Sequence, residues 1–361
     1  MKTIHFILLM SLGMLASCIR EDDTPVVIPP IEGATIAANV GGATQPNQVW
    51  IDLSENTQTF NQRDRWDLAF YNGSQFRVLI NSSIMMAVGK VEGYTDIDQV
   101  NSQTVAELKS KVQVGNFQDN VQYIDVPSGD FLNQTSGIAE INESESQNTV
   151  YLLNMGRELY TGSIAPKRAF VGGAERGWMK IRILRTATEY KIQFAELDSP
   201  THEELTIEKD TDYHFNYFSL RQKSLVKIQP PKKKWDLCFT VFTNAVDAGS
   251  YFTSYTFSDM ILHNTLDHTG VYQVTTEAGQ GEVAYKAFQK ADVDESRFVY
   301  NDQRALGSHW RTTTGANGAE VFSDRFYIIK DAEGFYFKLR MMKMSNEEGY
   351  RGYPEFEYQP L

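Results

Sequence analysis

Three residues of this sequence carry side chains that suit a transition metal such as iron. His309 offers a neutral imidazole, and the adjacent Met85 and Met86 offer thioethers. If Met85 and Met86 lie in a regular strand, only one of them can face a given side. The alternatives are an ordinary surface or hydrogen-bonded role for His309 and core packing for the two methionines.

Other chemistry has weaker support in the sequence. His263 and His268, with Asp267 between them, form the one close histidine pair, but two histidines and one carboxylate are a weak signal for a divalent metal. The sequence contains no nucleophile elbow, no phosphate-binding glycine loop and no zinc-protease motif. We therefore expect a binding protein rather than an enzyme, with no dedicated metal site.

The elements that must position these residues are organised around a repeated sequence motif, called the repeated phrase below. The strand-like segment Trp-Asp-Leu-x-Phe occurs twice, and two further pairs of segments recur in the same order, which indicates a tandem duplication. The three pairs are Trp66–Phe70 with Trp235–Phe239, Arg185–Tyr190 with Lys330–Phe335, and Tyr213–Tyr217 with Pro354–Tyr358.

The spacing of these pairs shows where the two copies differ. Trp66 and Trp235 lie 169 residues apart, whereas Arg185 and Lys330 lie 145 apart, so the first copy carries 24 additional residues in its middle. Insertions usually fall in loops, and loops carry specificity. We expect the copies to differ in function at this insertion and at the loop that holds His309.

The composition predicts an all-β fold with minor helix. Aromatic residues make up 12% of the chain and alternate with polar ones along the strand-like segments, as half-buried strands require. Asn72-Gly73-Ser74 predicts a hairpin turn after Trp66–Tyr71. Asp96–Val112 has the clearest helical spacing, and Phe288–Phe298 is a candidate for a second, short helix.

Charge and cysteine content exclude some classes of protein. The formal net charge is −12, and the one basic cluster, Lys232–Lys234, is too small for a nucleic-acid interface. Cys238 lies in an apolar strand and is expected to be a small buried hydrophobe, so no disulfide with Cys18 is expected.

The N-terminus predicts export and lipidation. Residues 1–17 have the basic start and apolar run of a signal peptide, and Leu15-Ala16-Ser17-Cys18 is a lipoprotein processing site, with Cys18 as the lipidated residue. No other segment is apolar for long enough to cross a bilayer. We expect a flexible acidic, proline-containing tether over residues 18–46, a first repeat over 47–223 and a second over 224–361.

These segments resemble the HmuY family of surface haem-binding lipoproteins. The resemblance rests on both Trp-Asp-Leu-x-Phe strands, on Arg325–Gly334 and on the closing Phe356-Glu357-Tyr358, and it extends over nearly all of residues 47–361. It implies two tandem antiparallel β units, a lipid anchor in the outer membrane as the sole membrane attachment, and display on the cell surface, for which the acidic residues after Cys18 are an export signal.

The resemblance also implies a function. Family members bind haem through a histidine pair or a methionine pair, one of them on the loop before the late hairpin, and pass it to a TonB-dependent transporter. That loop has Trp310 here, but the ligand position falls near Thr314-Gly315, so no ligand carries over directly. His309, Met85 and Met86 are our candidate axial ligands for haem or a related porphyrin. The alternative is an adhesion or scaffold lipoprotein that kept the strands and does not bind haem.

Overall fold

The computed structural model describes residues 31–315 and 318–361. The expected signal peptide, Cys18 and the acidic residues that follow lie outside these ranges. Strands dominate the described chain and pair antiparallel, which confirms the all-β class with minor helix. No helix among the described residues is long and apolar enough to cross a membrane.

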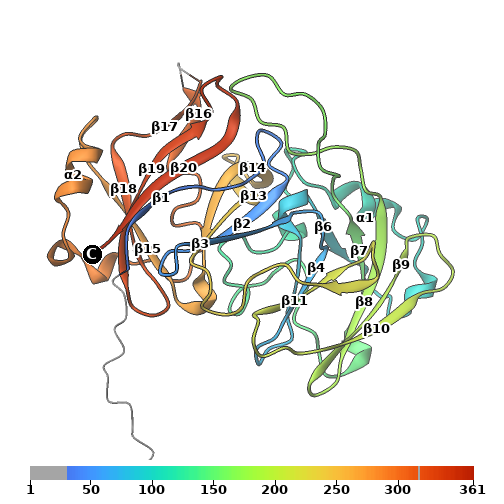
Figure 1. Ribbon diagram of the computed structural model, residues 1–361. Helices are drawn as coiled ribbons and strands as arrows, with labels where there is room; N and C mark the ends of the chain where they lie inside the picture. The colour runs from blue at the N-terminus through green and yellow to red at the C-terminus, as the bar shows by residue number, and fades with distance from the viewer. Residues whose placement is uncertain (1–30, 316–317) are drawn as a thin grey trace, which may run out of the picture. The chain divides into compact units, whose positions relative to one another are not determined.

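The strands form two matched pairs of sheets (Figure 1). The first pair consists of a five-stranded sheet of order β10-β9-β8-β7-β6 and a four-stranded sheet of order β12-β11-β4-β5. Their bounds are β4 Leu68–Tyr71, β5 Val78–Ile80, β6 Ala87–Lys90, β7 Val150–Asn154, β8 Trp178–Arg185, β9 Glu189–Glu196, β10 Glu203–Glu208, β11 Phe215–Ser219 and β12 Ser224–Val226. We call this pair of sheets the first structural unit.

The second structural unit has the same plan. Its five-stranded sheet has the order β1-β20-β19-β18-β15, and its four-stranded sheet has the order β14-β13-β2-β3. The bounds are β1 Ala34–Ala37, β2 Asn47–Asp52, β3 Thr57–Gln62, β13 Leu237–Asp247, β14 Phe252–His263, β15 Gly270–Thr275, β18 Arg325–Lys330, β19 Tyr336–Ser345 and β20 Arg351–Pro360. A separate hairpin joins β16 (Arg311–Gly315) to β17 (Gly318–Val321).

The repeated phrase has the same local structure in both units. Asn81 and Asn264 each donate a side-chain hydrogen bond to the carbonyl of the phrase tryptophan, Trp66 at 2.8 Å and Trp235 at 3.1 Å. Each asparagine also caps a short 3-10 turn, η1 (Ser82–Ile84) or η5 (Thr265–Asp267). Both turns end on a left-handed residue with φ 64°, which makes Met85 and His268 equivalent positions.

The two copies exchange strands. β11 pairs with β4, and β2 pairs with β13 in the corresponding place. The backbone amide of Leu220 donates to Asp67 Oδ2 at 2.7 Å, and that of Leu53 donates to Asp236 Oδ2 at 2.9 Å. β1 pairs with β20 as β10 pairs with β9, and in Figure 1 the blue β1 runs beside the red β20. The second unit is thus completed by the three strands at the start of the chain.

This exchange changes how the repeat is understood. The pairing of β11 with β12 crosses the expected boundary at 223/224, and β2 and β3 pair within the second unit. The expected match between Tyr213–Tyr217 and Pro354–Tyr358 is wrong in structure, because β11 lies in a four-stranded sheet and β20 in a five-stranded one. By sheet position, β20 corresponds to β9 and β19 to β8. The expected match of Arg185–Tyr190, at the turn between β8 and β9, with Lys330–Phe335, at the turn between β18 and β19, is therefore wrong as well.

The prediction of a flexible tether is wrong for residues 34–46. β1 pairs with β20 over four residues, and Ile36, Ala38, Val40 and Gln45 are buried. Short apolar residues in alternation supply one buried face of an edge strand, a signal that the nearby prolines and glycines obscured.

Helix occurs in short pieces. The expected helix over Asp96–Val112 consists of η2 (Ile97–Gln99) and α1 (Ala106–Lys111). The side chain of Asn101 accepts hydrogen bonds from the amides of Gln103 and Thr104, and this local bonding separates the two turns. In the second unit α2 (Gly281–Ala287) precedes the expected position, where Phe288–Phe298 holds only the 3-10 turns η6 (Lys290–Asp292) and η7 (Glu295–Arg297).

The cores follow this arrangement. Both units bury the Leu and Phe residues of their repeated phrase. A shared apolar cluster joins the two four-stranded sheets and includes the phrase tryptophans Trp66 and Trp235, together with Trp50 and Cys238. Cys238 is buried, as expected. The four-stranded sheets therefore pack through the repeated phrase itself.

Candidate functional site

A cleft of about 1680 Å³ opens on the surface of the described structure. Residues of both structural units line it. The connection between β7 and β8, residues 155–177, forms one wall, and residues of β14, β16 and β20 contribute to the other. In the second unit the corresponding connection between β18 and β19 is the short turn 331–335. The first unit therefore has the longer connection at this place, and this loop builds part of the cleft.

Aromatic side chains supply much of the apolar lining. Tyr160 and Phe170 come from the long loop and pack edge to face with their ring centroids 4.7 Å apart. Tyr255 and Phe257 come from β14 and form a second edge-to-face pair at 5.2 Å. Trp178 lies at the start of β8 with the ammonium of Lys109 over its ring, 5.2 Å from the centroid. Phe170 and Tyr255 are about half exposed, so the cleft presents aromatic surface to a ligand.

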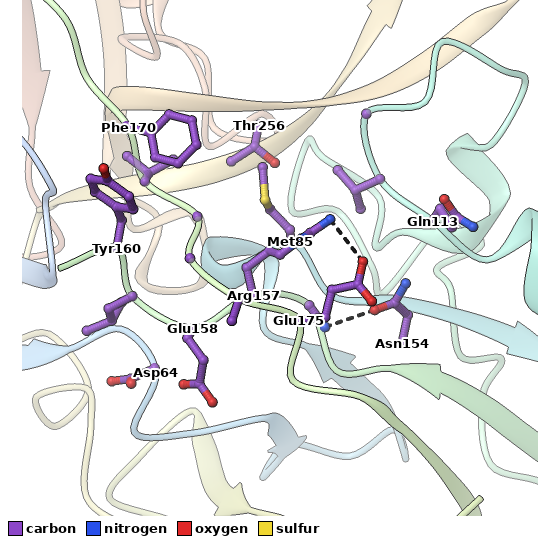
Figure 2. Close-up of a pocket in the computed structure, with 18 of the residues that line it drawn as sticks. Asp64, Met85, Gln113, Asn154, Arg157, Glu158, Tyr160, Phe170, Glu175 and Thr256 are labelled. Carbon is purple, nitrogen blue, oxygen red and sulfur yellow. Dashed lines mark hydrogen bonds and ion pairs between the residues drawn. The ribbon is translucent and has the colours of Figure 1, made fainter. Parts of the chain in front are cut away.

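Met85 lies in this cleft and Met86 does not. The left-handed backbone of Met85, at the end of η1, breaks the strand alternation and directs its side chain into the cleft, as Figure 2 shows. Met86 is fully buried in the core of the first unit. The Met85 sulfur lies 3.1 Å from where a Cβ on Gly172 would stand, so a side chain at position 172 would crowd the thioether.

His309 lies in a different hollow. It is exposed and lines a space of about 420 Å³ with β16 residues and Arg325, whose guanidinium donates to the His309 carbonyl at 2.8 Å. Partial burial of the ring, together with the charges of Arg325 and Arg304, lowers the pKa of His309, which favours the neutral imidazole. Arg311 and Thr313 line both hollows. The structure therefore does not bring His309 and Met85 to one site.

The histidine pair of the second copy does not gather around Asp267. His263 is buried with Nε2 3.2 Å from the Val299 carbonyl, and burial lowers its pKa to about 4. His268 stacks on Tyr300 with the ring centroids 4.1 Å apart. Asp267 instead pairs with His214 at 2.8 Å. Among the described residues no group of three His, Cys, Asp or Glu side chains could hold a metal ion.

In the expected match of Tyr213–Tyr217 with Pro354–Tyr358, His214 falls opposite Glu355, which predicts an exposed strand face. The side chain is instead buried against Asp267. The two residues are not equivalent in the structure, because His214 precedes β11 of a four-stranded sheet while Glu355 lies in β20 of a five-stranded one.

A buried polar network at the wall of the cleft had no signal in the sequence. Arg311, Arg351 and Ser258 line the cleft and surround the carboxylate of Asp259, which Gln45 also contacts. These residues come from four distant parts of the chain and form no motif. A motif search has no means of grouping them, because only the strand exchange brings Gln45 to this wall.

Charged residues at the floor of the cleft are mostly paired. Arg157 contacts Glu175 at 3.3 Å, as drawn in Figure 2, and Glu158 is bonded to Arg221. Such exposed pairs contribute little to stability. They leave the cleft with aromatic walls, one thioether and the buried arginines as its distinctive groups.

Comparison with known proteins gives matches to solved structures. One is a protein of Bacteroides fragilis NCTC 9343 described as a lipoprotein, with 14% identity, covering 50% of this chain and 88% of that one at a TM-score of 0.22. Another is described as an HmuY-like heme-binding protein of Bacteroides vulgatus ATCC 8482, with 10% identity, covering 92% and 93% of the two chains at a TM-score of 0.22. No curated protein matches the chain.

The family comparison matches the chain twice. The model of the HmuY protein family matches residues 44–199 and 212–358. The two matched segments begin just before β2 and β11, the strands that occupy equivalent places in the two units. Together they cover most of the sequence, and the chain therefore belongs to the HmuY family.

Proposed function

We propose that this chain is a lipoprotein of the outer-membrane surface that binds haem or a related porphyrin and passes it to a TonB-dependent transporter. The observation that carries the proposal is the placement of Met85 in an aromatic-walled cleft of a family member. A flat apolar ligand needs such walls, and a thioether is an established axial ligand of haem iron. Met85 is the first candidate ligand.

His309 is the second candidate ligand. Its imidazole lines a hollow that shares Arg311 and Thr313 with the cleft, and its lowered pKa favours the neutral form that can bind iron. Met86 is buried in the core of the first unit, which supports a packing role for it instead of iron ligation.

Haemin titration tests the binding proposal. The wild-type chain is expected to give a Soret band, and Met85→Ala is expected to shift that band and weaken binding on the order of tenfold or more. His309→Ala measures the contribution of the second candidate. Met342→Ala is the matched control, because Met342 is an exposed methionine of β19 outside both hollows.

Two results would count against this function. A haemin spectrum that the wild-type chain leaves unchanged across pH and redox state would reject haem binding. Co-purification with a non-transporter outer-membrane protein, without chromophore, would favour the adhesion or scaffold alternative. Transfer is tested by mixing the loaded chain with a TonB-dependent transporter and following the Soret band into the transporter fraction.

Lipidation at Cys18 is tested separately. Cys18→Ala is expected to abolish incorporation of labelled fatty acid and to release the chain from the membrane fraction, because we propose no other anchor. Surface display is then measured by protease accessibility on intact cells. Retention of Cys18→Ala in the membrane fraction would contradict a sole lipid anchor.

A further inference from the structure

The buried network at the cleft wall is built on a β-bulge in β14. Thr240 pairs with Met260 and Phe242 with Phe257, so one residue of β13 faces two of β14, Ser258 and Asp259. Asp259 has a left-handed backbone with φ 55°, and its carbonyl accepts a hydrogen bond from the indole of Trp310 at 3.1 Å. The bulge re-aims the Asp259 carboxylate toward two arginines at the cleft.

Arg311 and Arg351 share a single carboxylate, that of Asp259. Arg351 is bonded to Asp259 and donates to Ser258 Oγ at 2.8 Å, while Arg311 donates to the Ser258 carbonyl at 2.6 Å and lies 4.0 Å from Asp259. Among the described residues Asp259 is the one acidic side chain in ion-pair contact with either arginine. This group of three carries a net charge of +1.

Both guanidiniums also keep unused donors. The Nε atoms of Arg311 and Arg351 are buried and have no hydrogen-bond acceptor, although each side chain is 8% exposed and lines the cleft. A buried donor without an acceptor is unfavourable, and an unmatched buried charge more so. An anion bound in the cleft would offset the unmatched positive charge.

A third arginine extends the positive charge behind the wall. Arg63 is 1% exposed and donates to the carbonyls of Gln45, Ser83 and Val171, with no acidic partner in ion-pair contact among the described residues. Gln45 in turn donates to Asp259 Oδ1 at 2.5 Å. Burial lowers the pKa of Arg63 to about 10, which still leaves it charged at neutral pH.

We propose that Arg311 and Arg351 form a carboxylate-binding subsite in the cleft, so that the cleft selects a flat apolar ligand that bears a carboxylate. The flat ring system of the ligand is taken from the proposed function, whereas its carboxylate is inferred from the two arginines alone. The guanidinium fork matches the geometry of a carboxylate, and the aromatic walls take the apolar body. Asp259 neutralises one of the two guanidinium charges, so one positive charge is left for the ligand.

The first test compares acids with neutral analogues. Protoporphyrin IX, which lacks iron and carries two carboxylates, is titrated against its dimethyl ester by fluorescence. The ester is expected to bind about 10- to 100-fold more weakly, the effect of losing a hydrogen-bonded ionic contact. The pair 1-pyrenebutyrate and 1-pyrenebutanol repeats the comparison without a porphyrin.

Variants of the network give effects of opposite sign. Arg351→Gln is expected to remove most of the preference for the acid, whereas Asp259→Asn, which frees both guanidiniums, is expected to strengthen it about tenfold. Arg340→Gln is the control. Arg340 lies on β19, pairs with Glu357 and Glu282, and does not line the cleft. Circular dichroism confirms folding of each variant. A structural role alone would not make Asp259→Asn bind the acid more tightly.

The outcomes separate this inference from the proposed function. If haemin binds but acids and esters bind equally, the subsite is overturned and haem binding stands. If no porphyrin binds but 1-pyrenebutyrate is preferred in an Arg351-dependent way, the subsite stands and the haem proposal fails. Equal binding of the two pyrenes by the folded wild-type chain overturns the subsite.

Discussion

Asp67→Asn is expected to destabilise the protein by about 3–5 kcal/mol, while the same change at the repeated position, Asp236→Asn, is expected to leave stability at neutral pH equal or higher. Asp67 Oδ1 lies 2.8 Å from Arg176, and both side chains are almost fully buried. Removing the carboxylate charge strands a buried guanidinium, which is among the larger single-residue losses.

Asp236 has the opposite surroundings. Its carboxyl accepts from the Leu53 amide, no ion pair involves it among the described residues, and its charged neighbours are Asp52, Asp331 and Glu333. Burial, and then these negative charges, raise the pKa of Asp236 well above its ordinary value. An asparagine keeps an acceptor for Leu53 and removes the charge that burial disfavours.

The pH dependence follows from the same shift. A carboxyl whose pKa is raised by folding contributes full stability below its unfolded pKa, and that contribution is lost as the pH rises through the folded pKa. Denaturant unfolding at pH 5 and pH 8 should therefore show a decline with pH in the wild-type chain that Asp236→Asn reduces. Equal destabilisation by both substitutions would show that the two copies share one electrostatic environment.

Deletion of residues 32–46 is expected to cost on the order of 5 kcal/mol, enough to unfold many domains. The deletion removes β1 from the edge of β20 and exposes the surface that Ile36, Ala38 and Val40 cover. It also removes Gln45, which joins Asp259 to Arg63. A flexible tether would be deleted without loss, so thermal unfolding of the deletion variant decides between the two descriptions.

A circular permutant is the matched control for this deletion. Ala34 pairs with Tyr358, so a short linker from Leu361 to Glu32 would form a hairpin like the one between β9 and β10. New ends placed in the exposed turn 186–188 leave every sheet of the second unit intact. This permutant is expected to unfold within a few degrees of the wild type. Its failure to fold would contradict the completion of the second unit by β1 to β3.

Much of the fold could be predicted from sequence because it rests on local signals. The repeated Trp-Asp-Leu-x-Phe strand, the hairpin after it and the strand Val150–Asn154 are where alternation and turn residues placed them. The long helix over Asp96–Val112 was wrong because the bonds from Asn101 interrupt it, a local competition that spacing of apolar residues does not register.

The lining of the candidate cleft could be predicted only in part. Met85 could be selected by its side-chain chemistry, but its separation from Met86 depends on a left-handed turn that neither residue signals. The network of Arg311, Arg351 and Asp259 depends on a bulge and on strands from both ends of the chain. Partners this far apart in sequence are joined by the fold alone.

The strand exchange also constrains how the protein reaches its native state. Tyr358 donates a hydrogen bond to the carbonyl of Leu53, 305 residues earlier, and β1 remains an unpaired strand until β20 is available. Pairings this distant slow folding and leave strand edges open to aggregation. The second unit therefore cannot close before its last strand has been synthesised. We expect refolding of the full chain to be slow and limited by β1 to β3 joining the second unit.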